Sequence, residues 1–331
     1  MAGVAYAVYT PAVRFLFVMD PFEGLAWDKD TSFAFMRAAA RRGHEVWHCL
    51  LHHLGHRGRA VHARARRLTV HAGPPFLTAD SERTIELFDF DAVLLRKDPP
   101  FDVPYLRATQ QLDLVKSRVL VVNDPRGLRD ANEKLFTFQF AEHMPRSLVS
   151  ADRDAMLAFV DEVGGTAVLK PLDGAGGSGV VVLSSGDRNC RSLIDVWTEE
   201  GRRPALVQEY QPAVRTGDKR VLVLDGAPLG AILRVPREDD VRANIHAGGR
   251  VVPTELTARE AALVADVSPV LCQHGLWFVG LDLIGERLIE VNVTSPTGIQ
   301  ELSAFVGRPV EDDVIAWVEG RATELRGEAG V

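Results

Sequence analysis

WFVGLDLIGERLIEVNVTSPTG, residues 277–298, predicts two β-strands joined by a tight turn at Gly285–Arg287. Strict alternation along the second strand places Glu290 and Asn292 on one face. Asp282, the one acid of the first strand, lies opposite Glu290 on that face if the loop has an odd number of residues, whereas a two-residue loop puts the two acids on opposite faces. The other side chains of the second strand divide in the same way: Leu288 joins the Glu290 face, and Ile289, Val291 and Val293 form the other.

Three oxygen-bearing side chains on one strand face suggest a metal site. Asp282, Glu290 and Asn292 offer the carboxylate and amide oxygens that a hard cation such as Mg²⁺ prefers. The alternative is an exposed polar face of a sheet. This stretch alone leaves both interpretations open, so the rest of the chain has to decide between them.

The composition limits the classes of function. A length of 331 residues predicts two or three domains, and 46% hydrophobic and 25% charged residues are ordinary values for a soluble globular protein. A net charge of −7 argues against a general nucleic-acid binder. The one basic run, from His56 to Arg67, predicts a solvated loop or edge. No apolar run reaches about 18 residues, so no membrane span is expected.

The cysteines and the N-terminus bear on the compartment. Cys49, Cys190 and Cys272 are far apart and odd in number, so they predict neither a disulfide framework nor a zinc site. This usage favours a reducing compartment, and we expect the cytoplasm. The first thirteen residues lack a basic region and a long apolar core, so they predict a ragged extension rather than a signal peptide.

The first third of the chain alternates strands and helices. Strands are expected at 14–20, 45–50, 90–96 and 118–123, with helices at 32–42 and 105–117. This order predicts a parallel, doubly wound sheet. The charged run Arg96-Lys97-Asp98 follows the third of these strands, at the edge where open α/β sheets bind ligands. The alternative for this run is a proline turn with surface charges. A first domain boundary is expected near Arg129.

A glycine-rich run, DGAGGSG at 173–179, joins two predicted strands at 167–171 and 180–183. A P-loop and a dinucleotide fingerprint both require a helix after the glycines, so neither fits. The run predicts a hairpin loop, whose successive backbone N–H groups can still hold a phosphate. Lys170 directly before the loop, and Lys134 in the first turn of a helix expected from Asn132, make a nucleotide site the working hypothesis.

The last third continues with strands at 206–210, 217–225 and 230–234, a helix at 257–274 and a closing helix at 310–325. Between Arg234 and Arg250 lies a polar segment, 235–249, with three adjacent acids and the pair Gly248-Gly249. Such a glycine-hinged segment predicts a lid that closes over an anionic substrate. The alternative is an ordinary surface loop.

Several motifs together resemble the bacterial glutathione synthetases, which have the ATP-grasp fold. The similarity runs from about Arg14 to the C-terminal helix. The matching stretches are VMDP (18–21), LRKDPPFD (95–102), LRDANEKLFT (128–137), LKPLDGAGG (169–177), GDKRVLV (217–223), AGGR (247–250), and FVGLD (278–282) with NVTSPT (292–297). The RKDPP and VTSPT stretches are the ones most specific to this family.

The resemblance implies an α/β (α+β) architecture in three parts. These are an N-terminal substrate domain with a doubly wound parallel sheet (1–129), a central ATP-grasp lid domain (130–212) and a C-terminal ATP-grasp catalytic domain (213–331). ATP would lie between the last two. The resemblance also implies a homotetramer.

Residue roles follow from the same motifs. The ATP contacts implied are Lys134, Lys170, Gly174, Gly176, Gly177, Gln208, Glu209 and Tyr210. Two Mg²⁺ or Mn²⁺ ions would be held by Asp282, Glu290 and Asn292. The catalytic arginines implied are Arg220, Arg234 and Arg250. Substrate contacts are expected from Arg96, Arg234, Asn292, Ser295 and Thr297.

The implied reaction joins γ-glutamylcysteine to glycine. ATP activates the cysteinyl carboxylate as an acyl phosphate, and the amine of glycine then displaces phosphate. The products are glutathione, ADP and phosphate. Two alternatives stay open from the sequence: another ATP-grasp carboxylate–amine ligase, or a non-catalytic ATP-binding regulatory protein.

Overall fold

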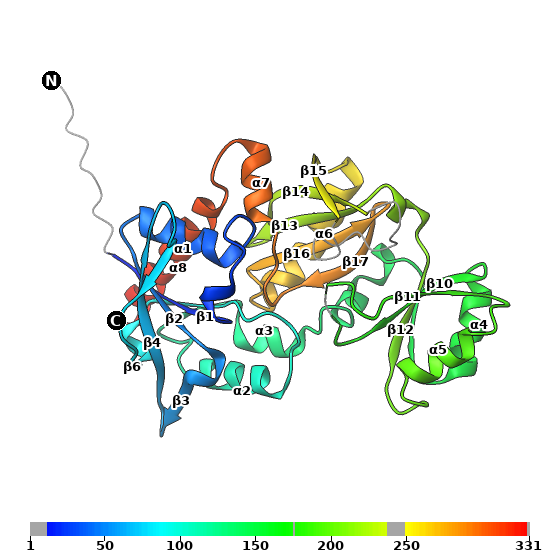
Figure 1. Ribbon diagram of the computed structural model, residues 1–331, viewed down its shortest axis with the longest axis horizontal. Helices are drawn as coiled ribbons and strands as arrows, with labels where there is room; N and C mark the ends of the chain where they lie inside the picture. The colour runs from blue at the N-terminus through cyan, green and yellow to red at the C-terminus, as the bar shows by residue number, and fades with distance from the viewer. Residues whose placement is uncertain (1–11, 175, 237–248, 330–331) are drawn as a thin grey trace.

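The computed structural model describes residues 12–174, 176–236 and 249–329, and it contains three β-sheets (Figure 1). In the view of Figure 1 the N-terminal sheet lies at the left, the sheet built from the last strands in the middle, and the central sheet at the right. The expected extension (residues 1–11) and most of the expected lid (237–248) fall outside the described residues.

The N-terminal sheet has a parallel centre, as predicted. The strands β2, β1, β7 and β8 lie side by side and all run in the same direction. The four residues from Phe15 to Val18 are fully buried, because helices and the neighbouring sheet cover both faces of this strand. The parallel strands are β1 (Arg14–Val18), β2 (Glu45–Cys49), β7 (Ala92–Leu95) and β8 (Leu120–Val122).

The basic run from His56 to Arg67 is not a loop, which corrects that part of the sequence interpretation. It covers the end of β3 and most of β4, a long strand that pairs antiparallel with β2. Buried and more exposed residues alternate along β4, with Val61, Ala63 and Ala65 inside. The basic side chains therefore belong to β-strands, on positions that alternate with buried ones. The strands of this extension are β3 (Leu54–Arg57), β4 (Ala60–Val70), β5 (Leu77–Ala79) and β6 (Arg83–Glu86).

Helix α1 packs beside the C-terminal helix α8, drawn blue and red in Figure 1. Asp30 begins α1 by accepting a hydrogen bond from the Phe33 amide at 2.6 Å. Ion pairs fasten the two helices to each other, including Arg37 to Glu311 at 3.0 Å. The helices here are η1 (Phe22–Gly24), α1 (Thr31–Arg41), η2 (Leu51–His53), η3 (Leu87–Asp89), α2 (Val103–Leu112), α3 (Pro125–Asp130) and α8 (Glu311–Ala329).

The central sheet is wholly antiparallel, in the order β11-β10-β12-β9, and it has a hydrophobic core of its own. The glycine run joins β10 to β11 as a hairpin, which confirms that prediction. Its elements are η4 (Phe136–His143), β9 (Ser147–Ser150), α4 (Arg153–Glu162), β10 (Thr166–Pro171), β11 (Val181–Ser184), α5 (Cys190–Trp197) and β12 (Ala205–Glu209).

The third sheet is antiparallel, in the order β15-β14-β13-β16-β17, and shares its buried core with the N-terminal sheet. These two sheets thus form one packed body, and the central sheet packs separately. The elements are η5 (Pro212–Arg215), β13 (Asp218–Leu224), β14 (Ala227–Val235), β15 (Arg250–Thr254), α6 (Ala258–Gln273), β16 (Phe278–Ile284), β17 (Arg287–Asn292) and α7 (Ile299–Val306).

The hairpin β16–β17 confirms the pairing of Asp282 with Glu290 but not the odd loop. The loop has two residues, Gly285 and Glu286, and both have positive φ, as in a type I′ turn. A β-bulge inserts Ile289 into the second strand, and this extra residue restores the register.

The bulge also corrects one face assignment. Leu288 pairs with Leu283 and is fully buried in the core, so it does not share the face of Glu290. Ile289 lies on the Glu290 side instead, where both residues line a pocket.

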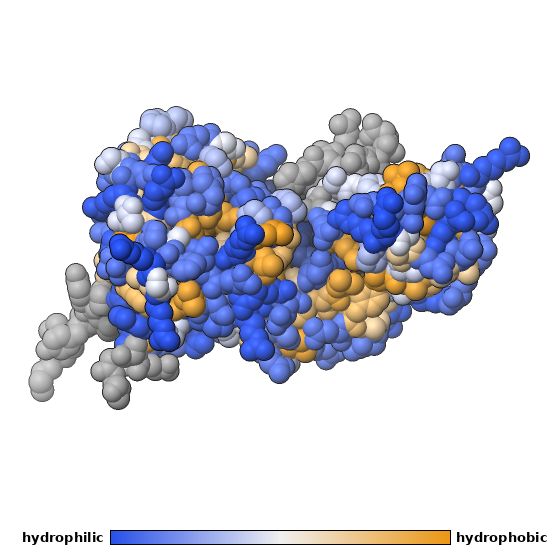
Figure 2. All heavy atoms as spheres, turned by 90° about the horizontal axis from the view of Figure 1, so that it is seen from below, coloured by the Kyte–Doolittle hydropathy of each residue, from blue (hydrophilic) through white to orange (hydrophobic). Residues whose placement is uncertain are grey.

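Polar residues cover most of the face shown in Figure 2, and hydrophobic side chains are scattered among them. The most exposed large apolar side chains, such as Val103 and Val196, are isolated cases that need no functional explanation. No helix among residues 12–329 that the structure describes is long and apolar enough to cross a membrane. The candidate functional site is the pocket between the central and third sheets.

Candidate active site

The pocket lies between the two separately packed bodies and comprises about 930 Å³ of space not filled by atoms, open solvent included. One part of its wall is apolar and the other part carries charge. The apolar wall comprises Val168, Val180, Val182, Val214, Ile284 and Ile289. The polar wall comprises Lys134, Lys170, Gly174, Gly176, Gly177, Ser178, Gln208, Glu209, Tyr210, Gln211, Asp218, Asp282 and Glu290.

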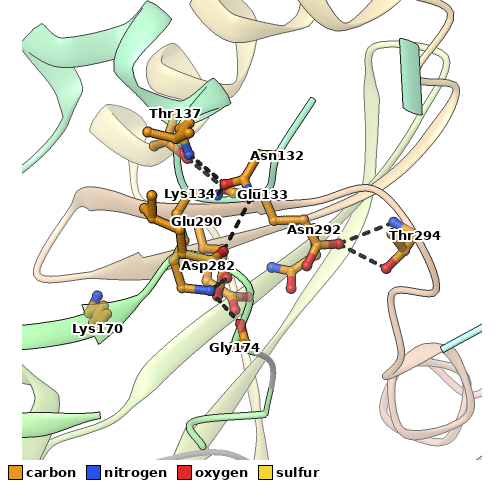
Figure 3. Close-up of polar contacts among 12 residues, drawn as sticks. Asn132, Glu133, Lys134, Thr137, Lys170, Gly174, Asp282, Glu290, Asn292 and Thr294 are labelled. Atoms are coloured by element: carbon orange, nitrogen blue, oxygen red, sulfur yellow. Dashed lines mark hydrogen bonds and ion pairs between the residues drawn. The ribbon is translucent and has the colours of Figure 1, made fainter. Parts of the chain in front are cut away.

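Lys134 crosses from the linker before η4 to both sides of the pocket (Figure 3). Its Nζ donates to the carbonyl oxygen of Gly174 at 2.5 Å and to Glu290 Oε1 at 2.9 Å. The predicted helix from Asn132 is in fact a turn: Asn132 Oδ1 accepts from the amides of Lys134 and Leu135, and η4 follows. This turn places the Lys134 ammonium group in contact with the first glycine of the loop, Gly174.

Lys170, on β10, contacts a neutral side chain and no carboxylate within the part of the chain that the structure describes. Its Nζ donates to Gln208 Oε1 at 2.8 Å, and Gln208 Nε2 donates to the Ser147 hydroxyl at 2.9 Å. Burial lowers the pKa of the Lys170 ammonium to about 8, although the Glu290 carboxylate acts in the opposite direction. A partly buried ammonium that contacts no carboxylate among the described residues favours the arrival of an anion.

The glycine loop presents backbone to the pocket. Gly176 and Gly177 have φ values of +61° and +75°, in the left-handed region that side chains disfavour. Gly174 is confined as well, since a Cβ there would lie 2.6 Å from Pro171. The sequence of this loop therefore keeps the backbone close to whatever fills the pocket. Ala175 lies outside the described residues.

Two arginines and two aspartates form a buried network beside the lysines. Arg220 binds both oxygens of Asp282, at 2.6 and 2.8 Å. Arg234 contacts Asp218 at 2.5 Å and Asp282 at 2.9 Å. All four residues are at most 8% exposed. Strand geometry brings these acids and bases together. Asp218 and Arg220 are two residues apart on β13 and so share one face, and their cross-strand partners are Arg234 on β14 and Asp282 on β16.

The charged groups in this network shift one another's pKa values. Burial would raise the pKa of Asp282, but Arg220 and Arg234 outweigh burial and hold that pKa well below its usual range. Burial raises the pKa of Asp218, and the neighbouring Asp282 adds to this effect against the pull of Arg234. Asp282 is thus a firmly ionised carboxylate at the floor of the pocket.

The structure brings the three expected metal ligands to one sheet face. Asp282 pairs with Glu290 and Gly280 pairs with Asn292, so the three side chains lie along adjacent strands. Both carboxylates already take cationic partners, Arg220 and Lys134. The residue set is one that fits a hard cation, although no cluster of three His, Cys, Asp or Glu side chains with metal-binding geometry occurs in the described ranges.

The residues expected at the adenine lie at the end of β12. Gln208 is buried, whereas Glu209 and Tyr210 are partly buried, and all three line the pocket next to the apolar wall. Glu209 also accepts a hydrogen bond from the Arg146 amide at 3.3 Å. All three therefore lie at the pocket, and their expected contact with adenine stays a prediction.

The five expected substrate contacts are not part of the pocket wall: Arg234 lies on β14, Asn292 ends β17, Ser295 and Thr297 lie in the segment after β17, and Arg96 contacts that segment. Arg96 is buried and donates to the Pro296 carbonyl at 3.0 Å. Arg220 reaches the Thr297 carbonyl at 3.4 Å, and the Ser295 hydroxyl donates to Asp98 at 2.6 Å. Arg250 stands apart, exposed at the start of β15.

Two site residues were not singled out from the sequence. Asp218 holds Arg234, and its position two residues before Arg220 on a strand was the available signal. Glu133 accepts hydrogen bonds from the Val293 amide, the Thr294 amide and the Thr294 hydroxyl, at 2.9, 3.2 and 2.9 Å. It thereby ties the turn that carries Lys134 to the end of β17. In the sequence, the one indication that Glu133 belongs to the site was its position directly before Lys134.

Solved structures define the class. The chain resembles the D-cycloserine synthetase DcsG, with a TM-score of 0.62, 14% identity, and coverage of 92% of this chain and 99% of that one. It also resembles the ATP-grasp ligase PsnB complexed with minimal precursor, Mg and ADP, with a TM-score of 0.60, 17% identity, and coverage of 93% and 97%. At these identities the likeness shows the fold, and the fold is that of the ATP-grasp ligases.

Sequence comparisons define the family within this class. Models of the prokaryotic glutathione synthetase N-terminal domain and ATP-grasp domain match residues 13–129 and 133–307. The glutathione synthetase of Gloeobacter violaceus is 46% identical over 314 residues, which cover 92% of this chain and 96% of that protein. That of Agrobacterium fabrum is 42% identical over 294 residues, or 88% and 92%.

The chain belongs to the prokaryotic glutathione synthetase family. It is an ATP-dependent ligase of glutathione synthesis, and its substrates are ATP, γ-glutamylcysteine and glycine. The predicted fold class, enzyme class and reaction are thereby confirmed. The roles of individual residues remain to be assigned from the geometry.

Proposed function

We propose that the pocket binds ATP with its adenine against the apolar wall and its phosphates at the lysine end. Gln208, Glu209 and Tyr210 would border the adenine. Lys134, Lys170 and the backbone of Gly174, Gly176 and Gly177 would hold the phosphates. The observation that carries this assignment is the contact pattern at the lysine end, where Lys134 contacts the Glu290 carboxylate and Lys170 contacts, among the described residues, only the neutral amide of Gln208. An ammonium group without a contacting carboxylate in a partly buried site favours an anion.

Asp282, Glu290 and Asn292 would hold Mg²⁺ or Mn²⁺, and the family resemblance implies two ions. These residues fit, since two paired carboxylates and an amide oxygen occupy one sheet face beside the phosphate end. When bound, the metal supplies positive charge that neutralises phosphate oxygens. Lys134, which now contacts Glu290, would then be free to bind phosphate instead.

The chemistry proposed is activation of a carboxylate followed by acyl transfer. The cysteinyl carboxylate attacks the γ-phosphorus, the bond between the β- and γ-phosphates breaks, and ADP leaves. The glycine amine then attacks the acyl carbonyl and phosphate departs with one carboxylate oxygen. Arg220, Arg234 and Arg250 would stabilise the negative charge that develops in these steps. Arg96, Asn292, Ser295 and Thr297 would contact the dipeptide, with Arg234 at its reacting carboxylate.

Isotope transfer tests this route directly. The dipeptide is supplied with ¹⁸O in its cysteinyl carboxylate, together with ATP, Mg²⁺ and glycine, and the released phosphate is analysed by mass spectrometry. One ¹⁸O atom per phosphate is expected from an acyl phosphate. Unlabelled phosphate with normal glutathione formation would show that the carboxylate never bonds to phosphorus. Omitting glycine gives the background of ATP hydrolysis.

The proposal also covers the oligomeric state and the cellular compartment. We expect a homotetramer on family resemblance, which sedimentation velocity checks: a monomer at micromolar concentration would refute it. We also place the protein in the cytoplasm, because its three cysteines are free and dispersed.

A further inference from the structure

The turn at residues 132–134 contacts both the central domain and the third sheet (Figure 3). On the central side, Asn132 Nδ2 donates to the carbonyl oxygen of Leu172 at 3.3 Å. Lys134 Nζ donates to the carbonyl oxygen of Gly174 at 2.5 Å. Both acceptors lie in the loop that follows β10, so the first and third residues of the turn bind the glycine hairpin.

The middle residue of the turn, Glu133, binds the end of the third sheet instead. Its carbonyl oxygen accepts from the Val291 amide at 3.1 Å. Its carboxylate oxygen Oε1 accepts from the Val293 and Thr294 amides at 2.9 and 3.2 Å, and from the Thr294 hydroxyl at 2.9 Å. Within the part of the chain that the structure describes, no arginine or lysine contacts this carboxylate, so its partners there are neutral donors.

The two backbone amides that Glu133 binds have no partner in the sheet ladder. Strand β17 ends at Asn292, so Val293 and Thr294 lie beyond the ladder, and both residues are buried. A buried N–H group without a hydrogen-bond partner is costly, and one carboxylate oxygen satisfies both groups. The Glu133 side chain therefore holds the turn against the end of β17.

The position of Lys134, the next residue, depends on this attachment. Its ammonium group contacts Gly174 of the central domain and Glu290 of β17. A lysine side chain is flexible, so the place of its charge depends on where its backbone is held. Small displacements matter in such a site, because about 1 Å of misplacement can cost roughly 100-fold in rate.

We propose that Glu133 is a positioning residue: it holds the turn against β17 and thereby places the Lys134 ammonium group where the ATP phosphates bind. This inference rests on the proposed function, because it takes Lys134 to be a phosphate contact. Glu133 itself touches neither the nucleotide nor the dipeptide.

Two other roles for Glu133 make different predictions. One is a contribution to stability alone, as from any partly buried hydrogen-bond acceptor, which predicts no specific link to Lys134. The other is an effect of its charge on metal binding, because burial and the nearby Glu290 carboxylate raise the pKa of Glu133. This second role predicts that the charge matters and the hydrogen bonds do not.

A double-mutant cycle tests the link between Glu133 and Lys134. The measured quantity is the Kd of β,γ-imido-ATP, a nonhydrolysable analogue of ATP, by calorimetry at saturating Mg²⁺. The proteins are the wild type, Glu133→Ala, Lys134→Met and the double variant. Asp152→Ala is the matched control, since Asp152 Oδ1 also accepts from two backbone amides, at 2.8 and 3.0 Å, but at the start of α4 and outside the pocket wall.

The expected result is a loss that does not add. Glu133→Ala raises the Kd by roughly tenfold and Lys134→Met by at least as much, the factor that one charge-assisted hydrogen bond gives. The double variant stays within about twofold of Lys134→Met, because Glu133 acts on the phosphates only through that lysine. Asp152→Ala keeps the wild-type Kd.

Two further variants separate the hydrogen bonds from the charge, and they keep the test decisive if Glu133→Ala does not fold. Glu133→Gln retains an oxygen that accepts the same three bonds, so the Kd stays within about threefold of the wild type. Thr294→Val removes one of the three donors and keeps the shape of the side chain. It raises the Kd by roughly threefold, and not at all in the Lys134→Met background.

Any of four results overturns the proposal. Additive losses in the double variant show that Glu133 does not act through Lys134. An equal weakening in Asp152→Ala shows a general effect of stability. A loss in Glu133→Gln as large as in Glu133→Ala shows that the charge acts. Wild-type affinity in both Glu133→Ala and Thr294→Val shows that the attachment does not matter. Failure of the proposed function gives a different result, since Lys134→Met then binds the analogue as tightly as the wild type.

Discussion

Two clusters of buried charge meet at the pocket, and they are built differently. In the arginine cluster, Arg220 and Arg234 face Asp218 and Asp282 through contacts of 2.5 to 2.9 Å. In the lysine cluster, Lys134 contacts Glu290, and Lys170 contacts a neutral amide. Each arginine of the first cluster has a carboxylate contact, whereas Lys170 of the second has none among the described residues.

This difference suggests that the arginine cluster chiefly maintains the structure and that the lysine cluster chiefly binds ligand. Arginine holds carboxylates through two fixed N–H groups, which suits a network that must keep its shape. Lysine is a point charge on a flexible stem and shifts its pKa readily on burial, as Lys170 does. The arginine cluster should therefore govern stability, and the lysine cluster should govern ATP binding.

Breaking the arginine cluster should have the largest effect. Asp282→Asn leaves two buried arginines with Asp218 as their one carboxylate partner among the described residues, and removing one member of a buried ion pair costs about 3–5 kcal/mol. We expect a loss of that size in the free energy of unfolding, measured with urea in the absence of nucleotide and metal. Asp313→Asn is the control, since its pair with Arg308 is exposed and should be worth less than about 1 kcal/mol. Equal losses in the two variants would contradict the comparison.

Glu290→Gln should separate function from stability. The side chain borders the pocket and is partly exposed, so the loss of its ion pair with Lys134 should lower the unfolding free energy by less than the about 3–5 kcal/mol expected for Asp282→Asn. The kcat should fall by roughly 100-fold at millimolar Mg²⁺, because a proposed metal ligand is lost, and excess Mg²⁺ should restore part of it. Glu286→Gln, the same change in the turn of this hairpin, should keep normal activity. Normal turnover of Glu290→Gln at modest Mg²⁺ would rule out the metal assignment.

The smallest effect expected is a pH dependence of ATP binding. The lowered pKa of Lys170, about 8, means that its ammonium loses its proton as the pH rises through 8. ATP binds the charged form better, so the Kd should increase above pH 8, by up to about tenfold per pH unit, and binding should take up a proton. Calorimetry from pH 6.5 to 9.5 measures both. Lys170→Arg stays charged, so its Kd should be flat over this range; a parallel rise would assign the titration to another group.

The sequence predicted this site through residue types and strand alternation, and it failed where a local irregularity mattered. The pairing of Asp282 with Glu290 was foreseen, but for the wrong reason. An odd loop was expected, whereas a two-residue turn and a bulge at Ile289 give the same register. Bulges depend on how the partner strand packs, so a period-2 pattern cannot reveal them.

Contacts between distant segments were the other limit. Glu133 bonds to residues about 160 positions away, and nothing in its local sequence specifies that partner. The strand β4 was missed because arginines on its exposed side obscured the small buried residues Ala63 and Ala65. Helix α3 was not predicted, because Asp124-Pro125 is typical of both turns and helix starts. In the structure Asp124 accepts from the Arg126 amide and begins a helix.

Helix α8 has a consequence for the order in which the protein folds. It covers the N-terminal sheet by packing on α1, and it binds Arg37 and Arg42 through Glu311 and Glu319. During synthesis this sheet leaves the ribosome long before α8 does, with the whole central domain and the third sheet made in between. Apolar residues beneath α8 stay in water for that interval. The sheet that begins the chain is therefore completed only after the catalytic part exists, which makes its exposed intermediate the species on which a chaperone would act.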